Sequence, residues 1–171
     1  MKPIALLAAL GLLAASAACG GPKDRSGAKL ELADARLVVT QADGTSHVLA
    51  LTAAGAVTFD NEPVLTLEKA GHILVGGKRL ARVESDGGIS ARKVRTNALV
   101  KDDGTFVLDG VDELTIGPDG AATGPLFETI DHPRVKLEGA KVRYEGPPGA
   151  RRATMVGFAA FLTNLPAAVA E

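Results

Sequence analysis

Few residues of this 171-residue chain are of the types that carry out chemistry, and they lie far apart. The chain has one cysteine and three histidines, which are Cys19, His47, His72 and His132. No two histidines have the spacing of a metal-ligand pair, and the sequence contains no GxSxG, HExxH or phosphate-loop motif. We therefore predict a non-enzymatic protein without a metal or cofactor.

Two pairs of adjacent residues place a histidine beside a second group that could take part in acid–base or nucleophilic chemistry. Asp131 and His132 are adjacent, but a polar loop before Pro133 explains them better than a metal or catalytic site. A hydrolase that uses this pair stays the alternative. Ser46 and His47 are also adjacent, but neighbouring strand residues point to opposite faces and do not form a nucleophile–base pair.

Acidic residues recur beside glycines, as in Asp102-Asp103-Gly104. Such clusters suggest calcium, but the alternating oxygen ligands and distal Glu of an EF-hand are absent from the sequence. We interpret these carboxylates as turn formers.

Basic residues form the strongest charge cluster of the chain. It consists of Arg92, Lys93 and Arg95, with Lys78, Arg79 and Arg82 about one repeat upstream. If neighbouring repeat units stack in register, these six side chains share one face, which we predict to contact an anionic partner. A solvated strand face that discourages edge pairing is the alternative.

The first residues have the three-part layout of a secretory signal peptide. Lys2 gives a positive start, residues 4–15 are uncharged and rich in Leu and Ala, and small residues follow directly before Cys19. The apolar run is shorter than the roughly 20 residues that span a bilayer. We therefore predict a cleaved signal at residues 1–18 rather than a transmembrane anchor.

The segment Ser16-Ala17-Ala18-Cys19 resembles the lipobox of bacterial lipoproteins. The resemblance implies that Cys19 becomes the first mature residue and carries acyl chains, and that Gly20 after it directs the protein to the outer membrane, facing the periplasm or the surface. Ser16 stands where that family prefers Leu, so ordinary cleavage, which gives a soluble periplasmic or secreted protein, is the alternative. Residues 19–28 lack a core-forming segment and are predicted to be a flexible tether.

Composition excludes several classes of protein. Lys and Arg number 19 against 20 Asp and Glu, so the chain lacks the basic excess of a nucleic-acid binder. A single cysteine excludes a disulfide scaffold and a cysteine-rich zinc module. With 46% hydrophobic and 23% charged residues, the chain has the composition of a folded domain.

A glycine recurs about every 16 residues through the middle of the chain. The repeat glycines are Gly55, Gly71, Gly87 or Gly88, Gly104 and Gly120. Two apolar columns keep the same spacing: Leu67, Val83, Val100 and Ile116, and Leu65, Ala81, Ala98 and Leu114. Apolar residues alternate within each unit, which indicates half-buried strands. His72, which follows Gly71, is accordingly predicted to begin a strand as a half-exposed residue.

These features predict an all-β domain over residues 29–149. Asp-Gly favours a type I′ hairpin turn, because both central residues of that turn need positive φ. About a dozen short strands would form an antiparallel meander that curls into a barrel or roll, or stacks as an antiparallel solenoid. A non-repetitive sandwich with unrelated turn glycines is the alternative.

The last segment, residues 150–171, is predicted to form an apolar helix and a tail. Thr154 is a suitable N-cap, and Pro166 should end the helix near Asn164. We predict a buried helix that plugs or covers one end of the β structure; docking on a partner or a membrane surface is the alternative. Arg151 and Arg152 are predicted to be solvated, with contact to anionic lipid as the alternative.

Together these observations predict a non-enzymatic, lipid-anchored cell-envelope protein that acts as a structural or partner-binding module. Its expected partners are the membrane, through the lipid at Cys19, and an envelope protein, but not nucleic acid. The alternative is a soluble periplasmic module that binds a small apolar ligand in the mouth of the β domain.

Overall fold

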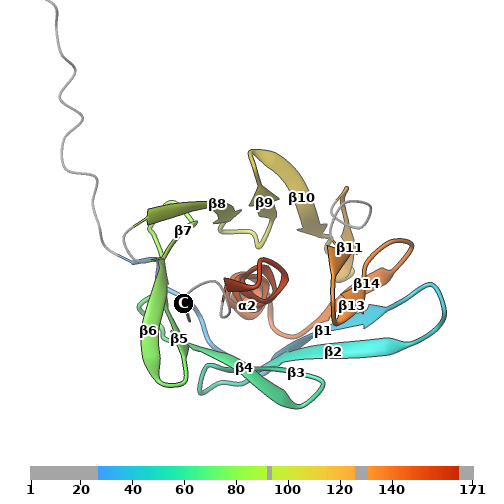
Figure 1. Ribbon diagram of the computed structural model, residues 1–171, viewed down its shortest axis with the longest axis horizontal. Coiled ribbons are helices and arrows are strands. Elements are labelled where there is room, and N and C mark those ends of the chain that lie inside the picture. The colour runs from blue at the N-terminus through green and yellow to red at the C-terminus, as the bar shows by residue number, and fades with distance from the viewer. Residues whose placement is uncertain (1–26, 92–93, 126–130, 166–171) are drawn as a thin grey trace, which may run out of the picture.

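Twelve antiparallel strands close into a barrel around a single helix in the computed structural model, which describes residues 27–91, 94–125 and 131–165 (Figure 1). The barrel strands are β1 (Ala35–Thr40), β2 (Ser46–Leu51), β3 (Ala56–Phe59), β4 (Glu62–Leu67), β5 (His72–Val75), β6 (Lys78–Val83), β7 (Gly88–Ala91), β8 (Val94–Val100), β9 (Phe106–Leu108), β10 (Val111–Ile116), β11 (Ala121–Thr123) and β14 (Lys141–Glu145). The predicted all-β barrel with one C-terminal helix is confirmed.

Each strand pairs with its sequence neighbours, except where β11 pairs with β14 and β14 pairs with β1 to close the ring. A separate two-stranded hairpin, β12 (Asp131–His132) and β13 (Val135–Lys136), lies in the connection between β11 and β14. A short 3₁₀ turn, η1 (Pro148–Ala150), then leads into the helix α2 (Arg151–Leu162).

The 16-residue repeat is a structural unit of the barrel. All eight residues of the two predicted apolar columns are buried. The backbone N–H of Val83 donates to the carbonyl of Gly71 (2.8 Å), and that of Val100 donates to Gly87 (2.9 Å). The glycine that begins a unit is therefore bonded to the apolar column of the same unit, which explains why both recur with one period.

The glycines of the repeat are needed for two reasons. Gly87 has φ +89°, a conformation that residues with a Cβ rarely adopt, and a Cβ added there would overlap the carbonyl oxygen of Val100. The other repeat glycines also have positive φ, between 81° and 88°. Only glycine lets one turn lie so close to the next hairpin.

The predicted type I′ geometry is wrong for the repeat turns. Among the described residues with positive φ, the repeat turns contribute the glycine but not the preceding aspartate. The Asp103 carboxylate instead accepts the backbone N–H of Thr105 at 2.8 Å, and Asp86 accepts that of Gly88 at 3.0 Å. Aspartate is favoured here because its side chain bonds two residues ahead, as in an Asx turn.

Turns with two positive φ values do occur, at the opposite end of the barrel. Asp60-Asn61 and Asp109-Gly110 connect β3 to β4 and β9 to β10 with φ values between 52° and 82°. A register shift then follows on the second strand of each hairpin from β3 to β10. Such bulges bend a strand and increase its twist, which helps a sheet to close.

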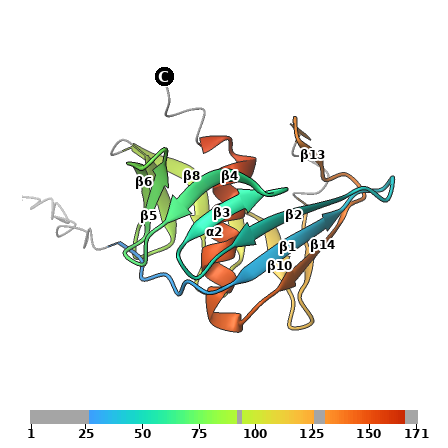
Figure 2. The same cartoon turned by 90° about the horizontal axis from the view of Figure 1, so that it is seen from below.

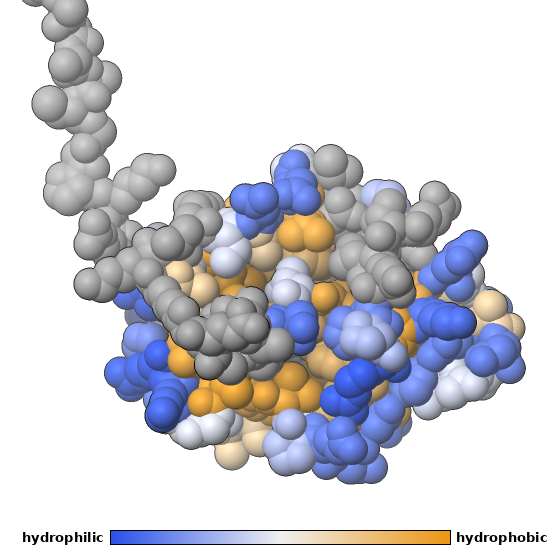
Figure 3. All heavy atoms as spheres, in the orientation of Figure 1, coloured by the Kyte–Doolittle hydropathy of each residue, from blue (hydrophilic) through white to orange (hydrophobic). Residues whose placement is uncertain are grey.

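The helix α2 runs along the barrel axis instead of covering one end. Strands surround it when viewed end on (Figure 1), and it spans the height of the barrel when viewed from the side (Figure 2). Every residue from 153 to 162 is buried, and Met155 and Phe158 are fully buried. Viewed along the axis, apolar residues gather inside the ring of strands and hydrophilic ones around it (Figure 3).

The helix begins four residues earlier than predicted. Ala150 occupies the N-cap position, and the Thr154 hydroxyl donates to the Ala150 carbonyl (2.9 Å) from within the first turn. The helix ends at Leu162, and Asn164 with φ +50° follows it, close to the predicted end.

Residues 27–34 cross the end of the barrel that carries the repeat glycines. The N–H of Ala28 donates to the Val83 carbonyl (2.8 Å) and that of Leu30 donates to Lys69 (2.9 Å), and the side chains of Ala28 and Leu30 are buried. Gly27 forms a β-bridge with Glu84 beside β6. Gly27 and Ala28, which the sequence places in the tether, therefore already contact the barrel.

Candidate functional site

Three residues of the predicted basic face, Lys78, Arg79 and Arg82, lie on β6. Ala81 and Val83 point into the core, so Arg82 between them points outward. Cross-strand register places Arg82 opposite His72 on one side and Ser90 on the other.

The same register extends to β8, where Arg95 lies opposite Ser90. The side chain of Arg95 lies outside the described residues. Lys78 and Arg79 are exposed near the tip of the β5–β6 hairpin. Arg92 and Lys93 lie outside the described residues.

Two arginines of this face are held by carboxylates. Arg79 lies 2.9 Å from Glu68 Oε2, and Arg82 lies 2.6 Å from Glu84 Oε2. Lys78 is exposed at the hairpin tip. Ion pairs this exposed contribute little stability, but they fix where the guanidinium groups point.

His72 shares the carboxylate that holds Arg79. It begins β5 and its side chain is 26% exposed, as predicted for a half-exposed strand residue. His72 Nδ1 lies 3.0 Å from Glu68 Oε2, but the angle is unsuitable for a hydrogen bond, and this buried nitrogen has no other hydrogen-bond partner among the described residues. The pair is therefore an electrostatic contact whose strength depends on the charge of the ring.

A second polar cluster lies at the opposite end of the barrel, around His47. Its Nδ1 is 2.7 Å from Asp60 Oδ2, and its Nε2 is 2.6 Å from the side-chain amide of Gln41. Burial raises the pKa of Asp60, but hydrogen bonds from His47 and from the backbone N–H of Val48 outweigh it and keep that pKa below its usual value. The Ser46 hydroxyl contacts the Thr40 hydroxyl and not His47. The described contacts of His47 hold the turn that carries Asp60 in position.

His132 lies at the far end of a row of four rings, three of them stacked and the His132 ring tilted against Phe161. His47 stacks on Phe59, Phe59 on Phe161, and Phe161 contacts His132 with ring centres 4.3 Å apart. The Arg134 guanidinium lies over Phe59 at 4.9 Å.

His132 is only 6% exposed and belongs to β12, so the predicted polar loop is wrong for this residue. Its Nδ1 accepts the backbone N–H of Arg134 at 3.3 Å, and the Arg134 side chain forms an ion pair with Glu62 at 2.7 Å. The ion pair attaches the β12–β13 hairpin to β4, and the ring contact of His132 with Phe161 attaches it to the end of α2. The side chain of Asp131 lies outside the described residues.

The acidic turns act as hydrogen-bond acceptors. Asp43, Asp86, Asp103 and Asp119 each accept the backbone N–H two residues ahead. The bond from Thr45 lowers the pKa of Asp43, and the bond from Thr105 lowers that of Asp103. Within residues 27–91, 94–125 and 131–165, no three His, Cys, Asp or Glu side chains are grouped so as to hold a metal ion.

Arg151 and Arg152 lie where α2 enters the barrel, and the prediction of a solvated pair is wrong for Arg152. Its side chain is only 12% exposed and forms an ion pair with the exposed carboxylate of Asp102. The Arg151 guanidinium lies 5.5 Å from the ring centre of Tyr144, whose pKa is raised by burial. Both arginines therefore help to position the start of α2.

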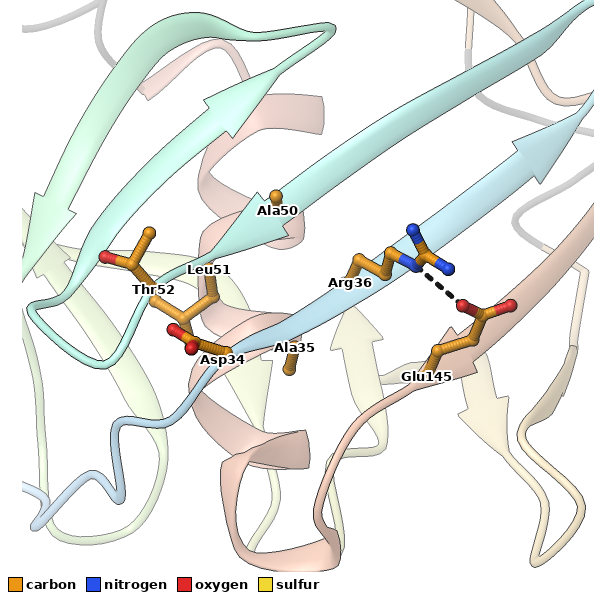
Figure 4. A pocket seen from close by; sticks show the side chains of 7 residues that line it. All are labelled: Asp34, Ala35, Arg36, Ala50, Leu51, Thr52 and Glu145. Carbon is orange, nitrogen blue, oxygen red and sulfur yellow. Dashed lines mark hydrogen bonds and ion pairs between the residues drawn. The ribbon is translucent and has the colours of Figure 1, made fainter.

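A shallow groove of about 380 Å³ lies on the outside of β1 and β2 (Figure 4). It is lined by Asp34, Ala35, Arg36, Ala50, Leu51, Thr52 and Glu145. Arg36 and Glu145 form an ion pair across it at 2.6 Å, and the Asp34 carboxylate accepts the N–H of Ala53 at 2.8 Å. Its polar groups are thus bonded to one another, and the groove offers no recognisable binding chemistry.

Sequence reasoning missed the carboxylates that accompany the basic face. Glu68 directly follows the apolar column at Leu67, and Glu84 follows it at Val83. Glu68 and Glu84 thus occupy the same position in neighbouring units, and such positions meet on one side of a sheet. The repeat could therefore have predicted carboxylates beside the basic face. Only the strand register shows which arginine each carboxylate reaches.

Cys19 and the proposed signal segment lie outside the described residues. Among the residues that are described, no helix has the length and apolar character needed to cross a membrane. Comparisons with protein-family models, with curated proteins and with solved structures found no match for this chain.

Proposed function

We propose that this protein is a non-enzymatic module of the cell envelope, anchored by a lipid at Cys19 and built to present the walls of a rigid barrel to partners. The observation that carries the proposal is the path of residues 27–34, which fixes the start of the described chain beside β6. A chain held in this way connects a lipid anchor to a defined side of the barrel.

The filled core supports the role of a rigid binding module. The side chains of α2 occupy the barrel axis, and its residues from 153 to 162 are all buried. The contacts described for His47 and His132 are structural, which supports a non-enzymatic role. The basic face supplies one partner surface, with Lys78, Arg79 and Arg82 exposed or partly exposed on β6.

The alternative of a small apolar ligand inside the barrel has less support. Such a ligand needs a lined cavity, whereas α2 fills the space that the strands enclose. Native mass spectrometry of the purified protein tests this alternative, since a co-purified ligand would appear as added mass.

Metabolic labelling with radioactive palmitate tests the anchor. We expect label on the wild-type protein and none on the Cys19→Ser variant, with both proteins present in equal amounts. Label that persists in the Cys19→Ser variant would rule out anchoring through this residue.

Photo-crosslinking in intact cells tests the partner role. A photoreactive residue at Lys78 on β6, or at Arg143 on the opposite wall, is expected to yield an adduct with another envelope protein from at least one wall. The absence of adducts from both positions would contradict the proposed role of a partner-binding module.

A further inference from the structure

We infer that the basic face of β6 lies against anionic lipid head groups of the membrane that carries the anchor, so that the barrel rests on its side. This inference rests on the proposed function, because it assigns the anionic partner of that face. The surface consists of Lys78, Arg79 and Arg82, which lie on β6.

The point at which the described chain begins places this face near the membrane. Gly27 pairs with Glu84 at the end of β6, and a Cβ on Gly27 would lie 3.4 Å from Arg82 Cδ. Eight residues, 19–26, separate this point from the start of the mature chain. They reach about 28 Å when extended and roughly 15 Å as a coil, so the face next to Gly27 stays within reach of the head groups.

The charge distribution favours a sideways orientation over an end-on one. The barrel end nearest the tether, formed by residues 27–34, 52–55, 68–71, 84–88, 101–105, 117–120 and 146–152, has eight acidic residues against five basic ones. An anionic surface repels this end. It attracts the adjoining wall, where Lys78, Arg79 and Arg82 lie on β6.

The arginines of this wall are already oriented. Arg79 and Arg82 are bonded to Glu68 and Glu84, which lie toward the turns rather than at the hairpin tip. Lys78 is exposed at that tip. Each Lys or Arg close to an anionic membrane surface strengthens binding roughly fivefold, so a few such residues suffice to orient a protein that a lipid already holds.

Vesicle binding by the chain from residue 19 onward with Cys19→Ser tests this orientation without help from a lipid anchor. We expect binding to vesicles of phosphatidylglycerol and phosphatidylcholine in low salt, and much weaker binding to phosphatidylcholine alone. Charge reversal at Lys78→Glu with Arg79→Glu should weaken binding more than tenfold. The matched double variant Lys141→Glu with Arg143→Glu, at exposed positions of the opposite strand β14, should change it less than twofold.

Thermal unfolding of each variant checks that the barrel is intact, and Lys78→Glu alone replaces the double variant if Arg79→Glu disturbs the Glu68 contact. Equal losses from the β6 and β14 variants would overturn the inference, as would equal binding to the two kinds of vesicle or to neither. Because the assay uses a chain without lipid, its result is independent of palmitate labelling, so failure of the anchor and failure of the orientation are distinguishable.

Discussion

The aspartates of the tight turns link local hydrogen bonding to acid stability. The N–H of Thr105 holds the pKa of Asp103 below its usual value, so this carboxylate stabilises the fold above the pKa of the unfolded chain. The contribution is lost as the pH falls through the lowered pKa of the folded state, in a window below about pH 4. Asp103→Asn should therefore lose less stability than the wild type between pH 5 and pH 3.

Urea unfolding across this pH range measures the difference. Asp43→Asn serves as a parallel variant, because Asp43 has a lowered pKa for the same reason. Identical pH dependence in the wild type and both variants would show that these turn bonds do not contribute to acid stability.

Arg152 is the residue whose partner matters most at the start of α2. Its side chain is 12% exposed while that of Asp102 is 88% exposed, so Asp102→Ala removes a solvated carboxylate and leaves a mostly buried guanidinium unpaired. We expect a loss of about 1–2 kcal/mol in the free energy of unfolding. The comparison variant Asp109→Ala, in a turn at the other end of the barrel, leaves the ion pair of Arg152 in place. If Asp102→Ala were as stable as the wild type, that result would contradict this role of the ion pair.

Individual residue contacts were only partly predictable from the sequence. The half-exposed position of His72 follows from strand alternation beside Gly71. The contact between His47 and Asp60 depends on the register of the β2–β3 pair. The stacking of Phe59 on Phe161 joins a strand to the helix that the barrel encloses. Nothing in a single sequence specifies such pairs.

At the scale of the elements, the repeat turns allow a direct test of why glycine recurs. Gly87 and Gly110 have similar φ values of +89° and +82°, but an added Cβ overlaps the Val100 carbonyl at Gly87 and meets nothing within 4 Å at Gly110. We expect Gly110→Ala to cost about 1 kcal/mol and Gly87→Ala about 3 kcal/mol or more. Chemical denaturation measures both, and equal costs would show that close packing between hairpins does not require the glycine.

The same elements show what periodicity can and cannot predict. The apolar columns and glycines predicted the strands, because burial and turn geometry act within one unit. The predicted turn type was wrong because the Asp103 side chain accepts a backbone N–H and only Gly104 has positive φ. The predicted start of α2 was wrong because Thr154 lies inside the helix and bonds back to Ala150.

At the scale of the whole molecule, the barrel and the helix depend on each other. A ring of twelve strands encloses more space than its own inward side chains fill, and α2 supplies the rest of the core. The helix itself has no side-chain N-cap and no acidic residue in its first turn, so its stability comes from packing. The sequence predicted both elements but not that one encloses the other, because composition does not determine the diameter of a barrel.

Ending the chain after Gly149 should therefore abolish cooperative folding. The truncated protein would expose the inner face of every strand, and we expect it to bind a hydrophobic dye and to lack a sharp thermal transition. Phe158→Ala in the full chain is the milder comparison, with an expected loss of about 3–5 kcal/mol at a fully buried position. A truncated chain that unfolds cooperatively would contradict the mutual dependence of barrel and helix.

Attachment of this barrel to the envelope through Cys19 can be measured by mass spectrometry of the mature protein isolated from its own cells. We expect the mature chain to begin at Cys19 and its N-terminal peptide to carry the added mass of acyl chains. A mature chain that begins elsewhere, or one that begins at Cys19 with an unmodified thiol and amine, would contradict this expectation.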